Sequence, residues 1–226
     1  MVSKRVRNTA RLLFGAVSDS QIKHAYRVRV WLFVVSVVLT VAVLVLITQG
    51  TQTLHRLDVV ERERDSWQRP DDVIEPLRLK DGKVVAEVGC GAGYFALKLA
   101  SKVGEHGNVL AEDILREPLA FLWIRALLRH QGNVRVVHGD LDNPHLPKEW
   151  LDAVLIANTY HEFTNPQSIL GRTFQALRSD GRLVVLDRGP RSYHGESRAT
   201  QMQQSQITAA LVESDIRQSG FEVVSG

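Results

Sequence analysis

The sequence is poor in features that would each indicate a particular class of protein. Its 226 residues contain one cysteine, Cys90, which excludes an internal disulfide and a cysteine-based zinc site. There is no internal repeat and no low-complexity tract, so nothing indicates a repeat protein. Acidic residues are nearly missing from the first thirty positions, where Asp19 is the only one. The remaining composition, 44% hydrophobic and 23% charged, is that of a globular protein and not of a disordered one.

Positive charge is concentrated at the N-terminus. The basic residues of the first thirty positions are Lys4, Arg5, Arg7, Arg11, Lys23, Arg27 and Arg29. From Arg56 onward the two signs of charge are mixed, and the whole chain has a net charge of only +3. This excess is too small and too local to indicate a nucleic-acid partner, and we expect none.

A long apolar stretch follows the basic segment. Val30 to Ile47 contains no charged residue, and only Ser36 and Thr40 in it are polar. A helix of about 18 residues spans about 27 Å, close to the thickness of a bilayer core. Trp31 stands at one edge, where an interfacial aromatic residue is favoured. The pattern predicts a basic segment over residues 1–29 and a transmembrane helix over residues 30–48.

The flanks of this stretch favour an uncleaved anchor. The basic segment is much longer than the corresponding part of a signal peptide, and Thr48-Gln49-Gly50-Thr51 offers no small-residue cleavage site. The positive-inside rule places the N-terminus in the cytoplasm and everything after Gln49 on the far side of the membrane. We therefore expect a single-pass membrane protein.

The rest of the chain reads as a polar spacer, residues 49–69, and a domain, residues 70–226. Pro70 begins a short predicted helix, and from Val84 onward strand-like apolar runs alternate with helical patterns. The predicted elements are Val84–Val88, Tyr94–Val103, Asn108–Asp113, Leu115–His130, Val134–His138, Leu151–Asn158, Pro166–Leu177, Arg182–Asp187 and a last helix near Gln204–Ser219, before Phe221–Val224. This order predicts an α/β fold with a doubly wound, mostly parallel sheet.

A glycine-rich turn follows the first predicted strand. The stretch V-V-A-E-V-G-C-G-A-G-Y-F, residues 84–95, places Gly89, Gly91 and Gly93 between that strand and the next helix. Backbone N–H groups at the positive end of a helix can face a bound ligand there. In an open α/β sheet, ligands bind beyond the carboxyl ends of the strands.

Two side chains beside this turn argue against a dinucleotide. The nicotinamide fingerprint needs a third glycine where Tyr94 stands. Glu87, two residues before the first glycine, would repel a pyrophosphate and attract an ammonium group. The residues therefore favour a ligand with an amino-acid end and a nucleoside end.

The motif E-V-G-C-G-A-G-Y-F-A resembles the first motif of the class I S-adenosylmethionine-dependent methyltransferases, and the resemblance extends from about Trp67 to the last residue. It implies a Rossmann-like fold and S-adenosyl-L-methionine as cofactor. It implies that Glu87 and the turn hold the methionine portion, and that Asp113 receives the ribose hydroxyls. The preceding Glu112 should point to the opposite face of its strand.

Further cofactor contacts are implied at two more strand ends. Asp140 in H-G-D-L would contact the adenine amino group, with Leu141 packing beside it, and Asn158 falls at the fourth motif of the family. The complete predicted cofactor site is Glu87, Gly89, Gly91, Gly93, Tyr94, Asp113, Asp140, Leu141 and Asn158.

The cluster Tyr160-His161-Glu162-Phe163 follows the fourth strand and should lie near the transferred methyl group. His161 could remove a proton from a hydroxyl acceptor and Glu162 could orient it, while Tyr160 and His161 could equally pack the pocket wall. The pair His161-Glu162 has no further histidine at metal-ligand spacing, so we expect no metal. Amino-methylating family members often carry N-P-P-Y here, so N-T-Y-H disfavours a nucleobase or glutamine-amide acceptor and looks like a bacterial small-molecule branch.

The sequence thus predicts a membrane-anchored methyltransferase, in a bacterial inner membrane, that transfers a methyl group by direct displacement to a small or lipid-like acceptor. A non-catalytic S-adenosylmethionine-binding module and an NAD(P)-dependent oxidoreductase are the alternatives. The acceptor, the methylated atom and the oligomeric state stay open. The side of the membrane is also open, because S-adenosylmethionine is made in the cytoplasm. The family sheet usually ends with further strands, whereas here Phe221–Gly226 stands where a sixth strand is expected, so either the chain is truncated or the edge is built differently.

Overall fold

The computed structural model describes residues 19–190, 192 and 194–224. Most of the predicted basic segment, including Lys4 and Arg11, lies outside these residues. The chain divides into two compact units, one ending at His55 and the other comprising Arg56–Gly226. The second unit thus begins at Arg56, within the predicted polar spacer.

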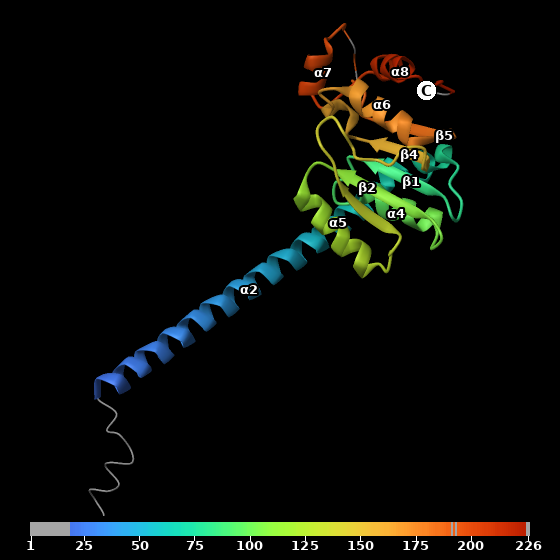
Figure 1. Cartoon of the computed structure of the whole chain (residues 1–226). Helices are drawn as coiled ribbons and strands as arrows, with labels where there is room; N and C mark the ends of the chain where they lie inside the picture. The colour runs from blue at the N-terminus through green and yellow to red at the C-terminus, as the bar shows by residue number, and fades with distance from the viewer. Residues whose placement is uncertain (1–18, 191, 193, 225–226) are drawn as a thin grey trace, which may run out of the picture. The chain divides into compact units, whose positions relative to one another are not determined.

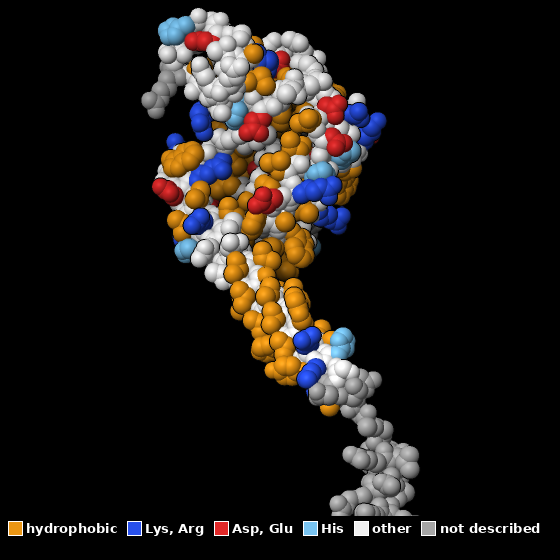
Figure 2. All heavy atoms as spheres, turned by 90° about the vertical axis from the view of Figure 1, so that its left-hand side faces the viewer, with side chains coloured by type: hydrophobic (Ala, Val, Ile, Leu, Met, Phe, Trp, Pro, Cys, Tyr) orange, Lys and Arg blue, Asp and Glu red, His pale blue; other side chains and the backbone are white. Residues whose placement is uncertain are grey.

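The apolar stretch lies in one long helix, α2, which covers Asp19–Gln68. The helix is long and apolar enough to cross a membrane, and none of its most apolar window is buried. Figure 2 shows the hydrophobic side chains lying uncovered along it. Trp31 and Phe33, for example, are each 70% exposed. Within the described residues, therefore, nothing covers the stretch.

The second unit is built on a five-stranded parallel sheet, drawn in Figure 1. Its strands are β1 (Val84–Val88), β2 (Asn108–Asp113), β3 (Val134–His138), β4 (Leu151–Ala157) and β5 (Leu177–Leu186). Their order across the sheet is β3-β2-β1-β4-β5. The order reverses direction at β1, so the loops after β1 and β4 diverge to opposite faces and leave a crevice between them.

Helices cover both faces of the sheet. One core packs α4 (Tyr94–Val103) and α5 (Arg116–Leu128), together with α3 (Pro70–Ile74) and η1 (Glu75–Leu77), against the sheet. The opposite core contains α6 (Pro166–Ala176), η2 (Tyr160–Glu162) and α8 (Ala209–Gln218), and α7 (Arg198–Gln203) precedes α8. All five residues of β1 are buried, because a central parallel strand is covered on both sides. The predicted doubly wound fold is confirmed.

The C-terminal region differs from the prediction. The helix expected near Gln204–Ser219 is α8, which begins only at Ala209. Helix α7 was not predicted, and Ser205, with a positive φ of 53°, lies in the turn between α7 and α8. Residues 221–224 form no strand, and Phe221 instead packs edge-on against Phe174 at 5.0 Å between ring centroids. The expected sixth strand is therefore wrong for these residues: Phe221 packs against the core that contains α6 and α8, and Val224 is exposed.

Candidate cofactor site

The glycine turn is held in place by close packing on both sides. Gly89 and Gly93 have φ of +74° and +86°, a region that residues with a side chain rarely adopt. A Cβ on Gly89 would lie 2.2 Å from Thr159 Cγ2, and one on Gly93 would lie 2.1 Å from Leu122 Cδ1. A Cβ on Gly91 would meet nothing within 4 Å. The turn thus packs against Thr159 at one end and Leu122 at the other, and it is open at Gly91, where a ligand can approach the backbone.

Two carboxylates at the end of β2 accept hydrogen bonds from this turn. Asp113 Oδ2 accepts from the Gly91 amide at 2.8 Å, and Glu112 Oε2 accepts from the Gly89 amide at 3.4 Å. Both residues line the same cavity. The prediction that Glu112 points away from the site was wrong. It sits where Gly139 leaves room for it, since a Cβ on Gly139 would lie 1.8 Å from Glu112 Oε1.

Besides Arg125 Nε, two buried polar atoms of cavity-lining residues lack a partner within the described part of the chain. Glu87 is 2% exposed, and its Oε2 accepts no hydrogen bond. The Asn158 Nδ2 atom is likewise buried and donates none, while its backbone is held at φ 56° by a bond from its N–H to the Leu186 carbonyl. Buried polar groups are rarely left unpaired in folded proteins. These two atoms therefore offer an acceptor and a donor to a polar ligand.

Burial perturbs both glutamates. Removal from water raises the pKa of Glu87 well above its usual value, against the opposing effects of the Ala96 amide and Arg64. Burial likewise raises the pKa of Glu112 to about 7, although the Gly89 amide opposes the shift. A cationic group placed beside Glu87 would restore its ionised form.

The cavity has a volume of about 440 Å³, within the range of small-molecule sites. All the predicted cofactor residues line it except Gly93, which is buried behind it. Its wall also contains residues of α2 that the sequence reasoning missed, namely Leu57, Val60, Glu61 and Arg64. A solvated spacer was expected there, and nothing local in the sequence marks these residues as part of a site.

The cavity changes character toward its rim. Asp140 lines it, but its carboxylate is largely exposed and lies 2.7 Å from His145 Nε2. Beside it, Ile114, Leu115 and Leu141 are 41%, 59% and 66% exposed although all three are large and apolar. The cavity therefore has a charged interior around Glu87 and an apolar rim.

The structure separates the members of the predicted catalytic cluster. Glu162 and Phe163 line the cavity, whereas Tyr160 and His161 are not among the lining residues. The Tyr160 hydroxyl donates a buried hydrogen bond to Asp215 Oδ2 at 2.7 Å. Burial is the larger cause, and this hydrogen bond the next, of a raised pKa of the Tyr160 phenol. Tyr160 is thereby tied to α8.

His161 is paired with a residue that sequence reasoning missed. Its Nδ1 lies 2.8 Å from Asp187 Oδ1, and its backbone N–H donates to Asp187 Oδ2 at 2.9 Å. Its Nε2 lies 3.8 Å from Glu162 Oε1, at the cavity wall. Asp187 follows β5, so the rule that identified the other strand-end residues could have found it too.

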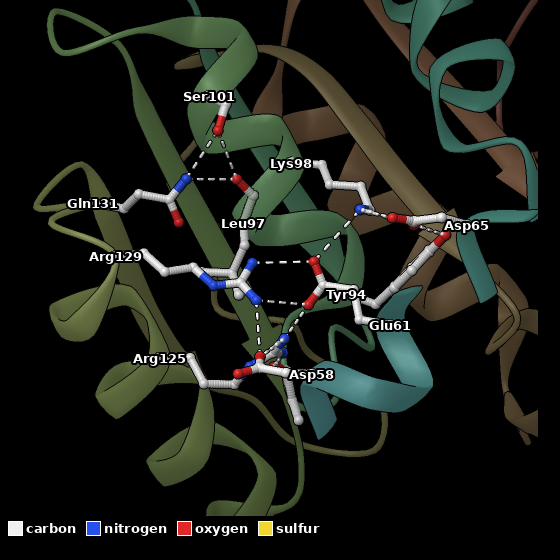
Figure 3. A network of polar contacts seen from close by, with 11 residues as sticks. Asp58, Glu61, Asp65, Tyr94, Leu97, Lys98, Ser101, Arg125, Arg129 and Gln131 are labelled. Carbon is white, nitrogen blue, oxygen red and sulfur yellow. Dashed lines mark hydrogen bonds and ion pairs between the residues drawn. The ribbon is translucent and has the colours of Figure 1, made fainter. Parts of the chain in front are cut away.

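The last turns of α2 are attached to the domain by a network of charges, shown in Figure 3. Arg125 of α5 forms ion pairs with Asp58 and Glu61, and its Nη1 donates to the Ala92 carbonyl in the glycine turn at 2.6 Å. Arg129 contacts the same two acids at 2.9 and 3.0 Å. Arg125 thus links α2 to the glycine turn of the cofactor site.

A second contact lies one helical turn further along α2. Asp65 accepts from the Tyr94 hydroxyl at 2.8 Å and pairs with Lys98 at 2.9 Å. Tyr94, at the start of α4, is thus fixed against α2 on the cavity wall.

A parallel sheet ordered β3-β2-β1-β4-β5, with acids at the ends of β1 and β2 around a glycine turn, defines the class I methyltransferase fold and its cofactor site. Comparison with known proteins agrees. Residues 79–222 match the family described as methyltransferase domain, and the chain belongs to that family.

Several relatives and structural neighbours are also methyltransferases by name. The chain is 32% identical over 135 residues to the ubiquinone/menaquinone biosynthesis C-methyltransferase UbiE of Azotobacter vinelandii, covering 59% of this chain and 49% of that protein. It is 30% identical to nocamycin O-methyltransferase of Saccharothrix syringae, over 55% of this chain and 43% of that protein. The chain thus spans about half the length of the curated relatives it matches.

Among solved structures, a SAM-dependent methyltransferase from Aquifex aeolicus superposes with a TM-score of 0.65 at 23% identity, covering 77% of this chain and 89% of that one. A phosphoethanolamine N-methyltransferase from Haemonchus contortus, solved with S-adenosyl-L-methionine, superposes with a TM-score of 0.58 at 18% identity, over 69% and 37% of the two chains. These likenesses concern the fold.

S-adenosyl-L-methionine is the cofactor of the family, and the residues of this cavity fit it. The unpaired Glu87 oxygen suits its ammonium group, and Asp113, at the end of β2, suits its ribose hydroxyls. When bound, this cofactor supplies an electrophilic methyl group on a sulfonium centre.

Proposed function

We propose that the protein is a membrane-anchored S-adenosylmethionine-dependent methyltransferase that acts on a lipid-like acceptor. The observation that carries the proposal is the combination of a cofactor cavity rimmed by Ile114, Leu115 and Leu141 with an uncovered apolar helix in the same chain. Exposed apolar side chains around a cavity are typical of a site for an apolar ligand. An acceptor dissolved in a bilayer would present such a surface.

The names of the relatives support the same class of acceptor. Several curated relatives are named for ubiquinone and menaquinone biosynthesis or as demethylmenaquinone methyltransferases. A quinol with an isoprenoid tail combines a ring that can accept a methyl group with an apolar tail suited to a membrane. We therefore take a tailed quinol as the first acceptor to test.

Direct displacement requires the acceptor atom to attack the methyl carbon in line with the bond to sulfur. The new bond forms to carbon, the old bonding pair returns to sulfur, and the acceptor loses a proton to a base. We propose that Glu162, on the cavity wall, and His161 behind it carry that proton. Asp187 fixes the orientation of the imidazole through Nδ1 and leaves Nε2 toward Glu162.

His161→Asn tests this assignment. We expect kcat to fall by about 100-fold, the usual contribution of a general base, with affinity for S-adenosylhomocysteine within about twofold of wild type. Tyr160→Phe is the matched control, because it removes a neighbouring hydroxyl that bonds to Asp215 outside the cavity. A similar fall in kcat in both variants would show that the cluster acts only through packing.

The proposed function is tested with the full-length chain in lipid nanodiscs and methyl-tritiated S-adenosylmethionine. The acceptors are demethylmenaquinol and the same ring without its isoprenoid tail, and the Glu87→Gln variant is the inactive control. Transfer to the tailed quinol, or to another component of a bacterial lipid extract, supports the proposal. Label found only in water-soluble products contradicts the lipid-like acceptor. Binding of the cofactor without any transfer would indicate the non-catalytic module.

We further infer that the catalytic unit faces the cytoplasm, where its cofactor is made, against the expectation from the basic N-terminus. A Gln52→Cys variant can report this with a membrane-impermeant thiol reagent, because the native Cys90 is 5% exposed and buried in the core. We expect labelling only after the cells are permeabilised. Labelling in intact cells would place the unit outside.

A further inference from the structure

Arg64 is a cation on the cofactor cavity wall with no acidic partner in the described part of the chain. It projects from α2, two helical turns after Leu57, and is half-buried. Its guanidinium carbon stacks 3.9 Å from the centroid of the Tyr94 ring, and its Nε atom donates to Gln68 Oε1 at 3.3 Å. These contacts fix the plane of the guanidinium group but leave both of its terminal nitrogens without a hydrogen bond among the described residues.

The same cavity contains Glu87, whose carboxyl group would carry the opposite charge when ionised. The two side chains interact electrostatically, since the charge of Arg64 opposes the rise in the pKa of Glu87. Burial lowers the pKa of Arg64, and Glu87 in turn opposes that shift. Yet the two form no ion pair, although Arg64 is the type of residue that would form one if the side chains could meet. The cavity thus holds a cation and, apart from it, an acid that a bound ammonium group would ionise.

A cation and an ionisable acid that do not pair with each other are complementary to a zwitterion. The methionine end of S-adenosylmethionine carries an ammonium and a carboxylate on one carbon. Glu87, at the end of β1, can receive the ammonium, which leaves the carboxylate without a cationic partner on the sheet side of the cavity. Arg64 is the residue whose free donors can take it, because a guanidinium group binds a carboxylate through two parallel N–H groups.

We propose that Arg64 binds the α-carboxylate of the cofactor, so that helix α2 completes the cofactor site. The inference rests on S-adenosylmethionine as the cofactor and is independent of the acceptor and of turnover. Asp65, the next residue, holds Tyr94 and Lys98, and Asp58 and Glu61 hold Arg125. These contacts, shown in Figure 3, attach α2 to the domain before and after residue 64 and so hold the backbone from which Arg64 projects.

The test compares two ligands that differ only in the carboxylate. Binding of S-adenosylhomocysteine and of its decarboxylated analogue is measured by calorimetry on the full-length chain, as wild type and as Arg64→Gln. A charged hydrogen bond of ordinary strength predicts that Arg64→Gln weakens S-adenosylhomocysteine about 10–100-fold. The affinity for the decarboxylated analogue should change by less than about twofold.

Two further variants sharpen the test. Arg64→Lys keeps the charge without the bidentate geometry and should fall between wild type and Arg64→Gln for S-adenosylhomocysteine alone. Arg62→Gln removes an exposed arginine from the same helix and should bind both ligands as wild type does. Equal weakening of both ligands by Arg64→Gln, or none of either, would overturn the proposal. If the wild type does not bind S-adenosylhomocysteine, the assignment of S-adenosylmethionine as the cofactor is wrong. That result can be distinguished from the two outcomes that overturn only the role of Arg64.

Discussion

Replacing Arg125 by methionine should detach the end of α2 from the catalytic unit. The Arg125 side chain is 4% exposed. It forms ion pairs with Glu61 and Asp58 and donates a hydrogen bond to the Ala92 carbonyl. Methionine fills a similar volume but donates no hydrogen bond. Every partner of Arg125 would then lose a donor in a region from which water is largely excluded.

The expected magnitude follows from what each partner retains. Removing one member of a buried ion pair commonly costs 3–5 kcal/mol, but here Glu61 keeps Arg129 and Lys98, so this part of the loss should be about 2 kcal/mol. The Ala92 carbonyl keeps no such substitute, which adds about 1 kcal/mol. We therefore expect the free energy of unfolding to fall by about 3 kcal/mol. In a unit of this size that lowers Tm by about 6–12 °C.

The assay is thermal unfolding of the full chain in detergent micelles, combined with hydrogen exchange over residues 56–68. Exchange should accelerate in this segment more than in the sheet strands. Arg129→Met is the matched control, since Arg129 contacts the same acids but is 35% exposed and does not reach Ala92. It should cost less than about 1 kcal/mol. An Arg125→Met protein that melts within a degree of wild type, or an equal loss in the control, would refute this reasoning.

Three further predictions concern the cavity. The pKa of Glu112 is about 7 in the folded chain against a usual value of 4.5, so the folded state holds the proton more tightly than the unfolded state does. The free energy of unfolding should therefore fall by up to about 3 kcal/mol as pH rises from 4.5 to above 7. The Glu112→Gln variant does not titrate, so its stability relative to wild type should be greater at pH 8 than at pH 4.5. The same relative stability at both pH values would contradict the raised pKa of Glu112. Glu87 should release up to one proton when S-adenosylhomocysteine binds, because the ligand ammonium favours the ionised carboxylate. The release is measured by calorimetry in buffers of different ionisation enthalpy, and Glu87→Gln should abolish it. Gly93→Ala should destabilise the fold by about 2 kcal/mol in thermal unfolding, because its Cβ would lie 2.1 Å from Leu122 Cδ1. Gly91→Ala, with no atom within 4 Å, should cost about half as much, and equal costs would refute the packing argument.

The central strands were predictable because burial on both faces makes them continuous apolar runs. Val84–Val88 and Asn108–Asp113 were predicted with the bounds that the structure gives. β5 begins five residues before its predicted start, since Arg178 to Gly181 lie at its exposed beginning and carry polar side chains that resemble a loop. The start of α8 was predicted five residues too early, because the turn at Ser205 is not marked by glycine or proline.

Within the site, the sequence revealed the residues that a strand places at its end and missed those that tertiary packing brings in. Glu87, Asp113 and Asn158 all line the cavity, as the strand-end rule implied. Arg64 enters from a helix that reads locally as a solvated spacer. Glu112 faces the site because Gly139, on the neighbouring strand connection, has no side chain to displace it. A single sequence does not encode such contacts in any local pattern.

The apolar stretch of α2 also bears on how the rate of the proposed reaction should be expressed. An enzyme held in a bilayer meets an acceptor dissolved in the same bilayer by lateral diffusion in two dimensions. The relevant concentration of acceptor is then its mole fraction among the lipids, and not its amount per volume of buffer. Diluting vesicles of fixed composition should leave turnover unchanged, whereas adding inert lipid to the same vesicles should lower it. The cofactor, arriving from water, should continue to obey its ordinary bulk concentration.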